Sequence, residues 1–189
     1  GLPVAFANDA AAAAYGEFWV GSGRDFHSMV LFTLGTGIGC GIIIGDLSID
    51  GENSHGAECG HVIIDRDADA RLCGCGQPGH LEAYASATAV IKRAEEVLAT
   101  RRETSLRARL AAGEELTPTL VAAEAESGDE LSREIVLEVA QAMGVGIVNM
   151  MHTIDPNGIL LGGAMTFGGH GSELGRWFLD EIKQEVARR

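Results

Sequence analysis

The chain has 189 residues, of which 46% are hydrophobic and 22% charged, a balance typical of a globular protein that excludes a disordered one. Its formal net charge of −13 disfavours a broad electrostatic surface for nucleic acid or anionic lipid. The length suffices for one sizeable core with a small appendage, and the most hydrophobic stretch, residues 29–44, is interrupted by glycines and threonines, so no membrane span is expected.

The first third of the chain predicts a strand, a helix and a hairpin. Residues 2–8 are predicted to form a short buried strand, and the alanine-rich run after Asp9 to form a helix. Residues 28–33 and 40–44 are apolar and β-branched, and they flank the glycine-rich segment LGTGIG. This pattern predicts a β-hairpin around a glycine-rich turn.

The middle of the chain changes from loop to helix. Residues 51–79 are rich in turn residues, and only 61–64 are predicted to form a short strand. From Leu81 onward the apolar spacing becomes helical, with two helices expected within residues 106–125.

The C-terminal third predicts helix, strand and helix. The longest helix is expected over residues 130–153, with Asp129 as its N-cap and Pro156 preventing its continuation. Residues 158–163 are predicted to form a buried strand, and 172–188 a final amphipathic helix. Strands followed by helices, then strand and helix, predict an α/β domain.

Residues 60–82 contain a possible metal site with the spacing H-x11-C-x-C-x4-H. Cys73 and Cys75 are separated only by a glycine, and the following turn residues allow His80 to return to the same point as His61. Two thiolates and two imidazoles form a closed tetrahedral set for zinc, which is typical of a structural site rather than a catalytic one. The alternative is that the cysteines are ordinary buried thiols and the histidines line a polar loop.

The segment LGTGIGCG is a possible phosphate-binding turn. Gly35, Gly37 and Gly39 would allow backbone N–H groups to approach phosphate oxygens, and Thr36 adds a hydroxyl donor. The segment matches neither the dinucleotide fingerprint nor the Walker loop, whose lysine is missing. A hairpin that is glycine-rich only because it packs tightly is an equal alternative.

Three carboxylates are candidates for proton transfer or hydroxyl binding. Asp9 opens a helix, where it would serve either as an N-cap or as a base that takes a proton from a substrate hydroxyl. Glu58 and Glu82 flank the possible metal site, although most glutamates are solvated at the surface. The acidic run at residues 65–69 is predicted to be a solvated loop tip.

Five segments together resemble one known family. FANDAAAAAYGE, TLGTGIGCGIIIGD, GAECGHVIID, CGCGQPGHLEAYAS and DPNGILLGGAM occur in the order and spacing of the ROK family of sugar kinases and sugar-responsive repressors. The resemblance covers essentially the whole chain and is greatest to the bacterial glucokinases of that family. It implies an α/β, actin- and hexokinase-like (ribonuclease H-like) ATPase lobe with a zinc loop and helical insertions. It also implies phosphoryl transfer from ATP with Mg²⁺ to a hexose hydroxyl, with glucose as the expected hexose.

The resemblance also implies roles for individual residues. Asp9 matches the catalytic base of the family. Four residues match its sugar contacts: Asn8, Glu58, His61 and Glu82. The glycine-rich turn, Gly35, Thr36, Gly37 and Gly39, matches its second phosphate loop, and Gly162 and Gly163 match the turn near the adenosine. Three residues match its structural zinc ligands: His61, Cys73 and Cys75. The fourth family ligand is usually a third cysteine, and here the position is His80, which can complete a Cys₂His₂ set.

One family motif is missing from the chain. The D-x-G-x-T phosphate hairpin does not occur, so residues 1–189 are expected to be the C-terminal lobe of a two-lobed kinase that lacks its N-terminal lobe here and is inactive by itself. One alternative is the sugar-sensing domain of a ROK repressor, which alone would involve nucleic acid; another is a zinc-stabilised interaction domain. The cysteine spacing and the lack of an export signal favour the cytoplasm, and the resemblance implies a homodimer.

Overall fold

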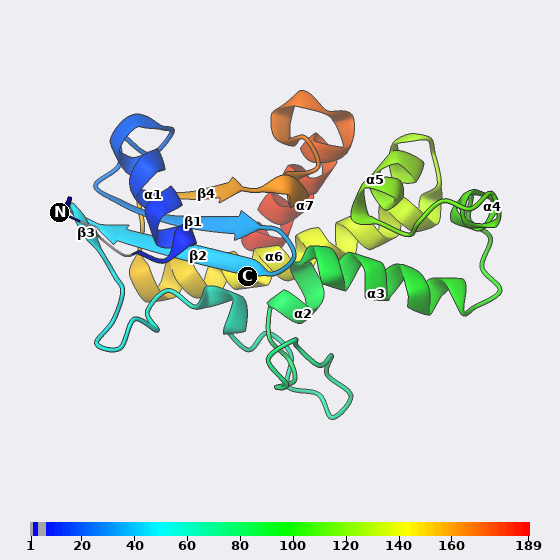
Figure 1. Cartoon of the computed structure of the whole chain (residues 1–189), viewed down its shortest axis with the longest axis horizontal. Helices are drawn as coiled ribbons and strands as arrows, with labels where there is room; N and C mark the ends of the chain where they lie inside the picture. The colour runs from blue at the N-terminus through cyan, green and yellow to red at the C-terminus, as the bar shows by residue number, and fades with distance from the viewer. Residues whose placement is uncertain (1, 4–6) are drawn as a thin grey trace.

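A mixed sheet of four strands forms the centre of the fold (Figure 1). The computed structural model describes residues 2–3 and 7–189, so residues 4–6, the middle of the strand predicted over residues 2–8, lie outside the described part. The sheet order is β3-β2-β1-β4. Its strands are β1 (Ser28–Leu34), β2 (Ile38–Ile44), β3 (Leu47–Ser48) and β4 (Gly158–Gly162). β1 and β2 form the predicted antiparallel hairpin, β3 extends it, and β4 runs parallel to β1.

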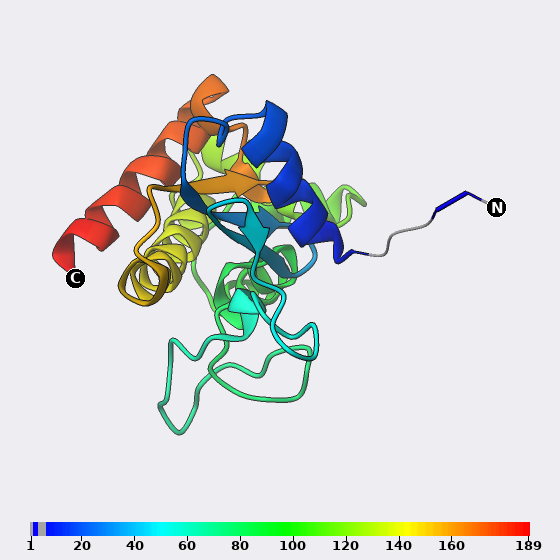
Figure 2. The ribbon, with the colours of Figure 1, turned by 90° about the vertical axis from the view of Figure 1, so that its left-hand side faces the viewer.

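Alternating side chains of β1 bury the two faces of the sheet against different helices. Met29 and Leu31 pack with Ala14 of helix α1 (Asp9–Val20), whereas Val30 and Phe32 belong to the main core with helices α6 (Glu130–Ile154) and α7 (Glu173–Arg188). This alternation follows from the two-residue period of a strand. Figure 2 shows the result, with α1 on one side of the sheet and α6 and α7 on the other.

Small residues let α1 lie directly on the hairpin. A Cβ atom at Gly41 would stand 2.5 Å from Cβ of Ala14 and 2.7 Å from the carbonyl oxygen of Ala10. A Cβ atom at Gly39 would stand 2.9 Å from Cβ of Ala10. Gly39 is therefore required for helix packing, whatever else it does, and the contact fixes the start of α1 beside the hairpin turn.

The remaining helices extend the molecule beyond the end of the sheet (Figure 1). They are α2 (Glu82–Ala85), α3 (Ala87–Leu98), α4 (Leu106–Ala111) and α5 (Pro118–Glu126), and α3 and α5 pack on the half of α6 that lies past the sheet. The two helices predicted within residues 106–125 and the long helix predicted over 130–153 are confirmed. Asp129 caps α6 by accepting the N–H of Ser132 at 2.9 Å, as predicted.

Helix α6 differs from the expectation that no segment could span a membrane. By length and composition alone α6 could cross a membrane, since its most apolar 18 residues have a mean hydropathy of 1.4. Half of those residues are buried, and the buried side chains belong to the main core. The hydropathy of α6 therefore reflects its place in the core, where it packs with residues of the sheet, α5 and α7.

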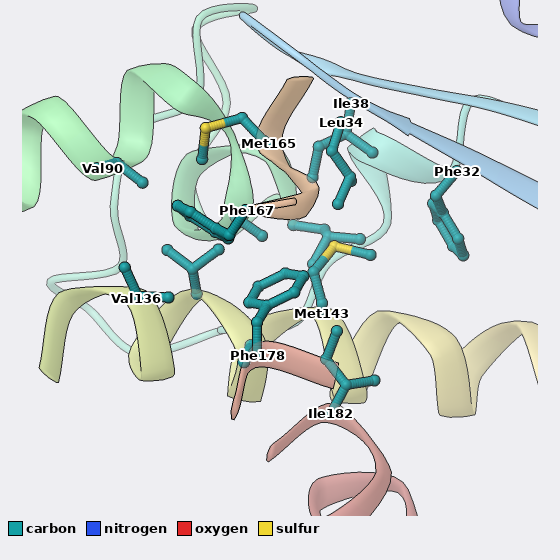
Figure 3. Packing of buried hydrophobic residues seen from close by; sticks show 14 of the residues in the cluster. Phe32, Leu34, Ile38, Val90, Val136, Met143, Met165, Phe167, Phe178 and Ile182 are labelled. Carbon is teal, nitrogen blue, oxygen red and sulfur yellow. The ribbon is translucent and has the colours of Figure 1, made fainter. Parts of the chain in front are cut away.

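The end of the hairpin next to its turn is anchored in this core (Figure 3). Leu34 and Ile38, which close the hairpin as its last pair, are 1% and 5% exposed. They converge with Met143, Met165 and Phe178 from three other segments. The hairpin turn between them, residues 35–37, is thus carried on a rigid base.

Two strand predictions were inaccurate. Residues 61–64 are not a strand, because Cys59–His61 form a 3₁₀ helix and Ile63 makes only an isolated bridge with His80. In the described part of the chain, no neighbouring strand continues the pairing there. The strand predicted over 158–163 exists, but every residue of β4 is only half-buried, since β4 is an edge of the described sheet.

Candidate functional site

A cavity of about 410 Å³ opens where the hairpin turn, the start of α1 and residues 58–61 meet. Most of the residues singled out from the sequence line it: Asp9, Gly35, Thr36, Gly37, Gly39, Glu58, His61, Glu82 and Gly163. These residues come from segments far apart in the chain, so their convergence is a property of the fold.

The start of α1 presents two polar side chains. Asn8 is the N-cap, because its Oδ1 accepts the N–H groups of Ala10 at 2.9 Å and Ala11 at 3.2 Å. The N-cap alternative for Asp9 is therefore wrong. One carboxylate oxygen of Asp9 accepts the N–H of Ala10 at 2.8 Å, and the side chain is exposed at the cavity.

Asn8 lines a second cavity of about 310 Å³ beside the first. The two cavities share Gly39 and Glu58 as walls. Among the described residues no partner is found for the amide nitrogen of Asn8, which leaves it able to donate a hydrogen bond.

The hairpin turn offers unused backbone donors. The N–H of Gly35 donates to the carbonyl of Gly37 at 3.0 Å, but the N–H groups of Thr36 and Gly37 donate to no protein acceptor in the part of the chain that is described. The carbonyl side of the turn is held from behind, since Gly35 accepts the N–H of Ala87 at 2.9 Å and Thr36 accepts the hydroxyl of Thr88 at 3.0 Å. A turn with free N–H groups on one side and bound carbonyls on the other can bind an anion.

Glu82 lies against the same turn. Its Oε2 accepts the N–H of Ile38 at 2.9 Å, and its Oε1 lies 3.5 Å from Sγ of Cys73. A Cβ atom at Gly37 would stand 2.3 Å from Oε2, so position 37 must be glycine while Glu82 occupies this place.

The four residues of the possible metal site come together. The ligand atoms of His61, Cys73, Cys75 and His80 all lie within 4.8 Å of one another. The two Nδ1 atoms are 3.3 Å apart, Cys73 Sγ is 3.8 Å from His61 Nδ1, and Cys75 Sγ is 3.3 Å from His80 Nδ1. The usual zinc–ligand distances in a tetrahedron give edges of about 3.3 Å between nitrogens and about 3.6 Å between nitrogen and sulfur. The donor set and its spacing therefore fit a closed structural zinc site.

His61 connects this cluster to the cavity. Its Nδ1 faces the cluster, while its Nε2 lies 4.0 Å from Oε2 of Glu58. One imidazole ring thus belongs to both sites. A cation on Nδ1 would keep the ring proton on Nε2 and make that nitrogen a donor toward the cavity.

Burial raises the pKa of the Cys73 thiol to about 11; the backbone N–H of Cys75 opposes this rise, whereas the Cys75 thiol and the Glu82 carboxylate add to it. Metal binding requires the thiolate, so a bound cation would have to offset these costs. Cys40 and Cys59, the other two cysteines, are buried elsewhere and do not join the cluster.

Sequence reasoning missed the side chains that tie this loop to the helices. The hydroxyl of Tyr84 donates to Asp65 Oδ2 at 2.5 Å and accepts the N–H of Arg71 at 2.7 Å. The hydrogen bond from Tyr84 lowers the pKa of Asp65. The guanidinium of Arg71 pairs with Glu96 on α3 at 2.6 Å. The reading of residues 65–69 as a solvated tip is thus wrong at Asp65, and no local pattern identifies such long-range partners.

The predicted Gly162-Gly163 turn joins two hollows. Gly163 lines the 410 Å³ cavity and also a larger groove of about 950 Å³ along β4 and α7, whereas Gly162 lines only the groove. Gly163 has φ of 92°, and a Cβ atom there would stand 2.3 Å from the carbonyl oxygen of Leu34. The turn therefore abuts the hairpin, as only glycine allows.

The chain combines an α/β lobe, a glycine-rich hairpin and a His-Cys-Cys-His cluster beside that hairpin. Comparison with known proteins identifies the family to which such a lobe belongs. The profile of the ROK family matches residues 1–173. The chain belongs to the ROK family, and the His-Cys-Cys-His cluster is typical of its zinc motif.

Named relatives include both enzymes and regulators. The chain is 34% identical to a glucokinase of Halalkalibacterium halodurans over 97% of its own length and 53% of that protein. It is 29% identical to a xylose repressor of Caldicellulosiruptor bescii over its full length and 45% of that protein. The crystal structure of a ROK family glucokinase from Streptomyces griseus in complex with glucose and AMPPNP superposes with a TM-score of 0.84 at 33% identity, covering 99% of this chain and 58% of that one. The chain thus spans about half the length of the relatives it matches.

Proposed function

We propose that this chain is the C-terminal lobe of an ATP-dependent hexose kinase, with glucose as the preferred substrate. The observation that carries the proposal is the convergence of Asp9, the free N–H groups of the hairpin turn, and Glu58, His61 and Glu82 on one cavity. The likeness to glucokinases, one of them crystallised with glucose and AMPPNP, supports the same reading.

The sugar would bind through both hydrogen-bond acceptors and hydrogen-bond donors. Glu58 and Glu82 supply carboxylate acceptors for hydroxyl groups, while Nε2 of His61 and the amide of Asn8 supply donors. Carboxylates disfavour anionic sugars, so a neutral hexose suits this wall.

The nucleotide would bind at the hairpin turn, beside Glu82. The N–H groups of Thr36 and Gly37 suit its phosphate oxygens. Gly163 stands between the cavity and the larger groove, so the adenosine would extend in that direction. MgATP enters as the substrate complex, in which the cation neutralises phosphate charge.

Asp9 would act as the general base. The hexose hydroxyl gives its proton to the Asp9 carboxylate while its oxygen forms a bond to the γ-phosphorus. The bond between that phosphorus and the β,γ-bridging oxygen breaks, and ADP leaves with those electrons. Most of the acceleration comes from holding both substrates in line and from stabilising the phosphate charge.

Zinc held by His61, Cys73, Cys75 and His80 would have a structural role. With all four positions filled by protein, it provides rigidity and not a reactive water. Its contribution to the reaction is to orient the His61 ring and the segment that carries Glu82.

The cavity is open on the side of Asp9, which is exposed. We propose that a second lobe, which carries the missing phosphate hairpin, closes over it and excludes water. The relatives' greater length is consistent with such a lobe.

A coupled ADP-release assay on the whole gene product, across a panel of hexoses, tests the proposal. The expected result is ATP-dependent turnover, highest with glucose, that requires Mg²⁺. Absence of turnover with every sugar in a folded, zinc-loaded protein would refute it.

A sugar-sensing regulator is the second candidate, because a xylose repressor matches the full chain at 29% identity. The same preparation distinguishes the two. A regulator would bind a sugar by calorimetry without releasing ADP, and it would bind operator-containing DNA through a separate module.

A further inference from the structure

We propose that Glu82 is a positioning residue that transmits the state of the metal cluster to the phosphate-binding turn. Its carboxylate joins the two sites directly, since Oε2 accepts the Ile38 N–H at 2.9 Å and Oε1 lies 3.5 Å from Cys73 Sγ. This role deepens the proposed function and rests on it, because it matters for catalysis only if the turn receives phosphates.

The backbone that carries Glu82 is firmly held. Glu82 follows the cluster residue His80 by two positions and opens α2. Leu81 between them is fully buried, and it packs so closely on α6 that a Cβ atom at Gly146 would stand 2.5 Å from its Cδ2. The carbonyl of His80 accepts the N–H of Ala83 at 2.9 Å. A displacement of His80 therefore moves this segment as a unit.

The turn is hydrogen-bonded to that segment and to the residues just after it at three points. Besides the bond from Ile38 to Glu82, the carbonyls of Gly35 and Thr36 are bound by Ala87 and Thr88, just beyond α2. Of the three, only the Glu82 bond also reaches a metal-site side chain. The same carboxylate lies against Gly37, whose N–H is one of the two free donors. Movement of Glu82 would therefore reorient the donors themselves.

Amide hydrogen exchange of Ile38 in the folded protein, with zinc and after chelation, tests this role. In the natural protein chelation should speed Ile38 exchange, while the Phe32 amide in the sheet reports global opening. In Glu82→Ala the Ile38 amide should exchange about 10-fold faster even with zinc, because a bond to a charged acceptor is lost. Chelation should then add little.

Conservative variants separate positioning from a general loss of structure. Glu82→Gln keeps an oxygen acceptor for Ile38. This variant should retain most of the exchange protection of the Ile38 amide and most of the protein's affinity for ADP. Glu82→Asp is one methylene shorter, keeps the charge, and should lose both. Glu95→Ala, an exposed carboxylate on α3, is the matched control and should change neither. A Glu82 side chain that only contacted sugar would leave ADP binding unaltered in every variant.

Either of two results would overturn the proposal. One is equal acceleration of Ile38 exchange by chelation in the natural protein and in Glu82→Asp. The other is unchanged Ile38 exchange in both Glu82→Ala and Glu82→Asp. The exchange measurements need neither sugar nor ATP, so their outcome is independent of whether the protein is a kinase.

Discussion

The two walls of the cavity owe their shapes to different forces. The hairpin of β1 and β2 has seven residue pairs, and the pair next to its turn, Leu34 and Ile38, lies in the main core. In the metal loop, residues 51–80, only Cys59, Gly60, Cys73 and Gly79 are buried, and the loop contains no strand. Apolar burial and backbone pairing thus fix one wall, whereas side-chain ties and a ligand set fix the other. Most perturbations should therefore affect one wall and not the other, apart from those that act through the bond between Glu82 and Ile38.

The largest effect is expected on chemistry at the rigid wall. Asp9→Asn removes the proton acceptor without disturbing the Asn8 cap, so kcat should fall on the order of 10³-fold while glucose binding and thermal stability stay nearly unchanged. Steady-state kinetics and calorimetry measure both. Asp25→Asn, an exposed carboxylate beyond α1, is the control, and full activity in Asp9→Asn would remove Asp9 from the role.

Loss of the metal should affect mainly the other wall, and in the hairpin only the Ile38 amide that Glu82 binds. Cys73→Ser replaces a thiolate ligand, so the zinc content should fall sharply and amides of the metal loop, such as those of Ile64 and Gly79, should exchange at least about 10-fold faster. The Phe32 amide in the hairpin should keep its protection. Elemental analysis and hydrogen exchange provide the readouts, and equal loss of protection in both walls would show that the two walls are not stabilised separately.

A remote change should alter both walls together. Asp129 caps α6, and its pKa is lowered although burial alone would raise it, because Ser132, Ser105 and Thr104 donate to it. Asp129→Ala should cost about 1 kcal/mol of unfolding free energy at pH 7. The folded-state pKa is below the unfolded value, so this stability is present above about pH 4 and is lost as the pH falls through the folded pKa. Urea titrations at pH 7 and pH 3 should show the difference between the two proteins shrinking at pH 3, and a constant difference would argue against this account.

The smallest effect should come from one tie of the metal loop. Tyr84→Phe removes the hydroxyl that joins Asp65 to the N–H of Arg71, so the Arg71 amide should exchange a few-fold faster while zinc stays bound. Tyr15→Phe, which alters a hydroxyl on the opposite face of the sheet, is the matched control. Loss of zinc from Tyr84→Phe would mean that the tie and the ligands are not separate supports.

The sequence predicted the parts of the fold that follow from local periodicity. The hairpin, α6 and α7 each carry a regular apolar pattern together with a turn or cap, and each was found within a residue or two of its expected place. The strand expected at residues 61–64 failed because a strand needs a neighbour, which no local pattern reports. The half-burial of β4 also depends on sheet order, which its own sequence does not contain.

The candidate site divides in the same way. Residue type and spacing indicated the four cluster residues and the turn glycines, but not what each glycine is for. Gly39 accommodates α1 and Gly37 accommodates Glu82, and both facts require coordinates. The sequence suggested Asp9 as the N-cap of α1, whereas Asn8 has this role in the structure, because both residue types are good N-caps. The Tyr84–Asp65 pair joins positions 19 residues apart, with no signal in either segment.

The contact of Gly41 with α1 limits how this protein could be redesigned. A methyl group at position 41 would meet not only the Ala14 side chain but also the main chain of Ala10, so trimming residue 14 cannot compensate for it. Directed-evolution libraries that vary the cavity should leave this seam untouched and diversify the metal loop. Most side chains of that loop are exposed or half-buried, although Gly79 must be kept, because a Cβ atom there would stand 1.9 Å from the carbonyl oxygen of Asp65.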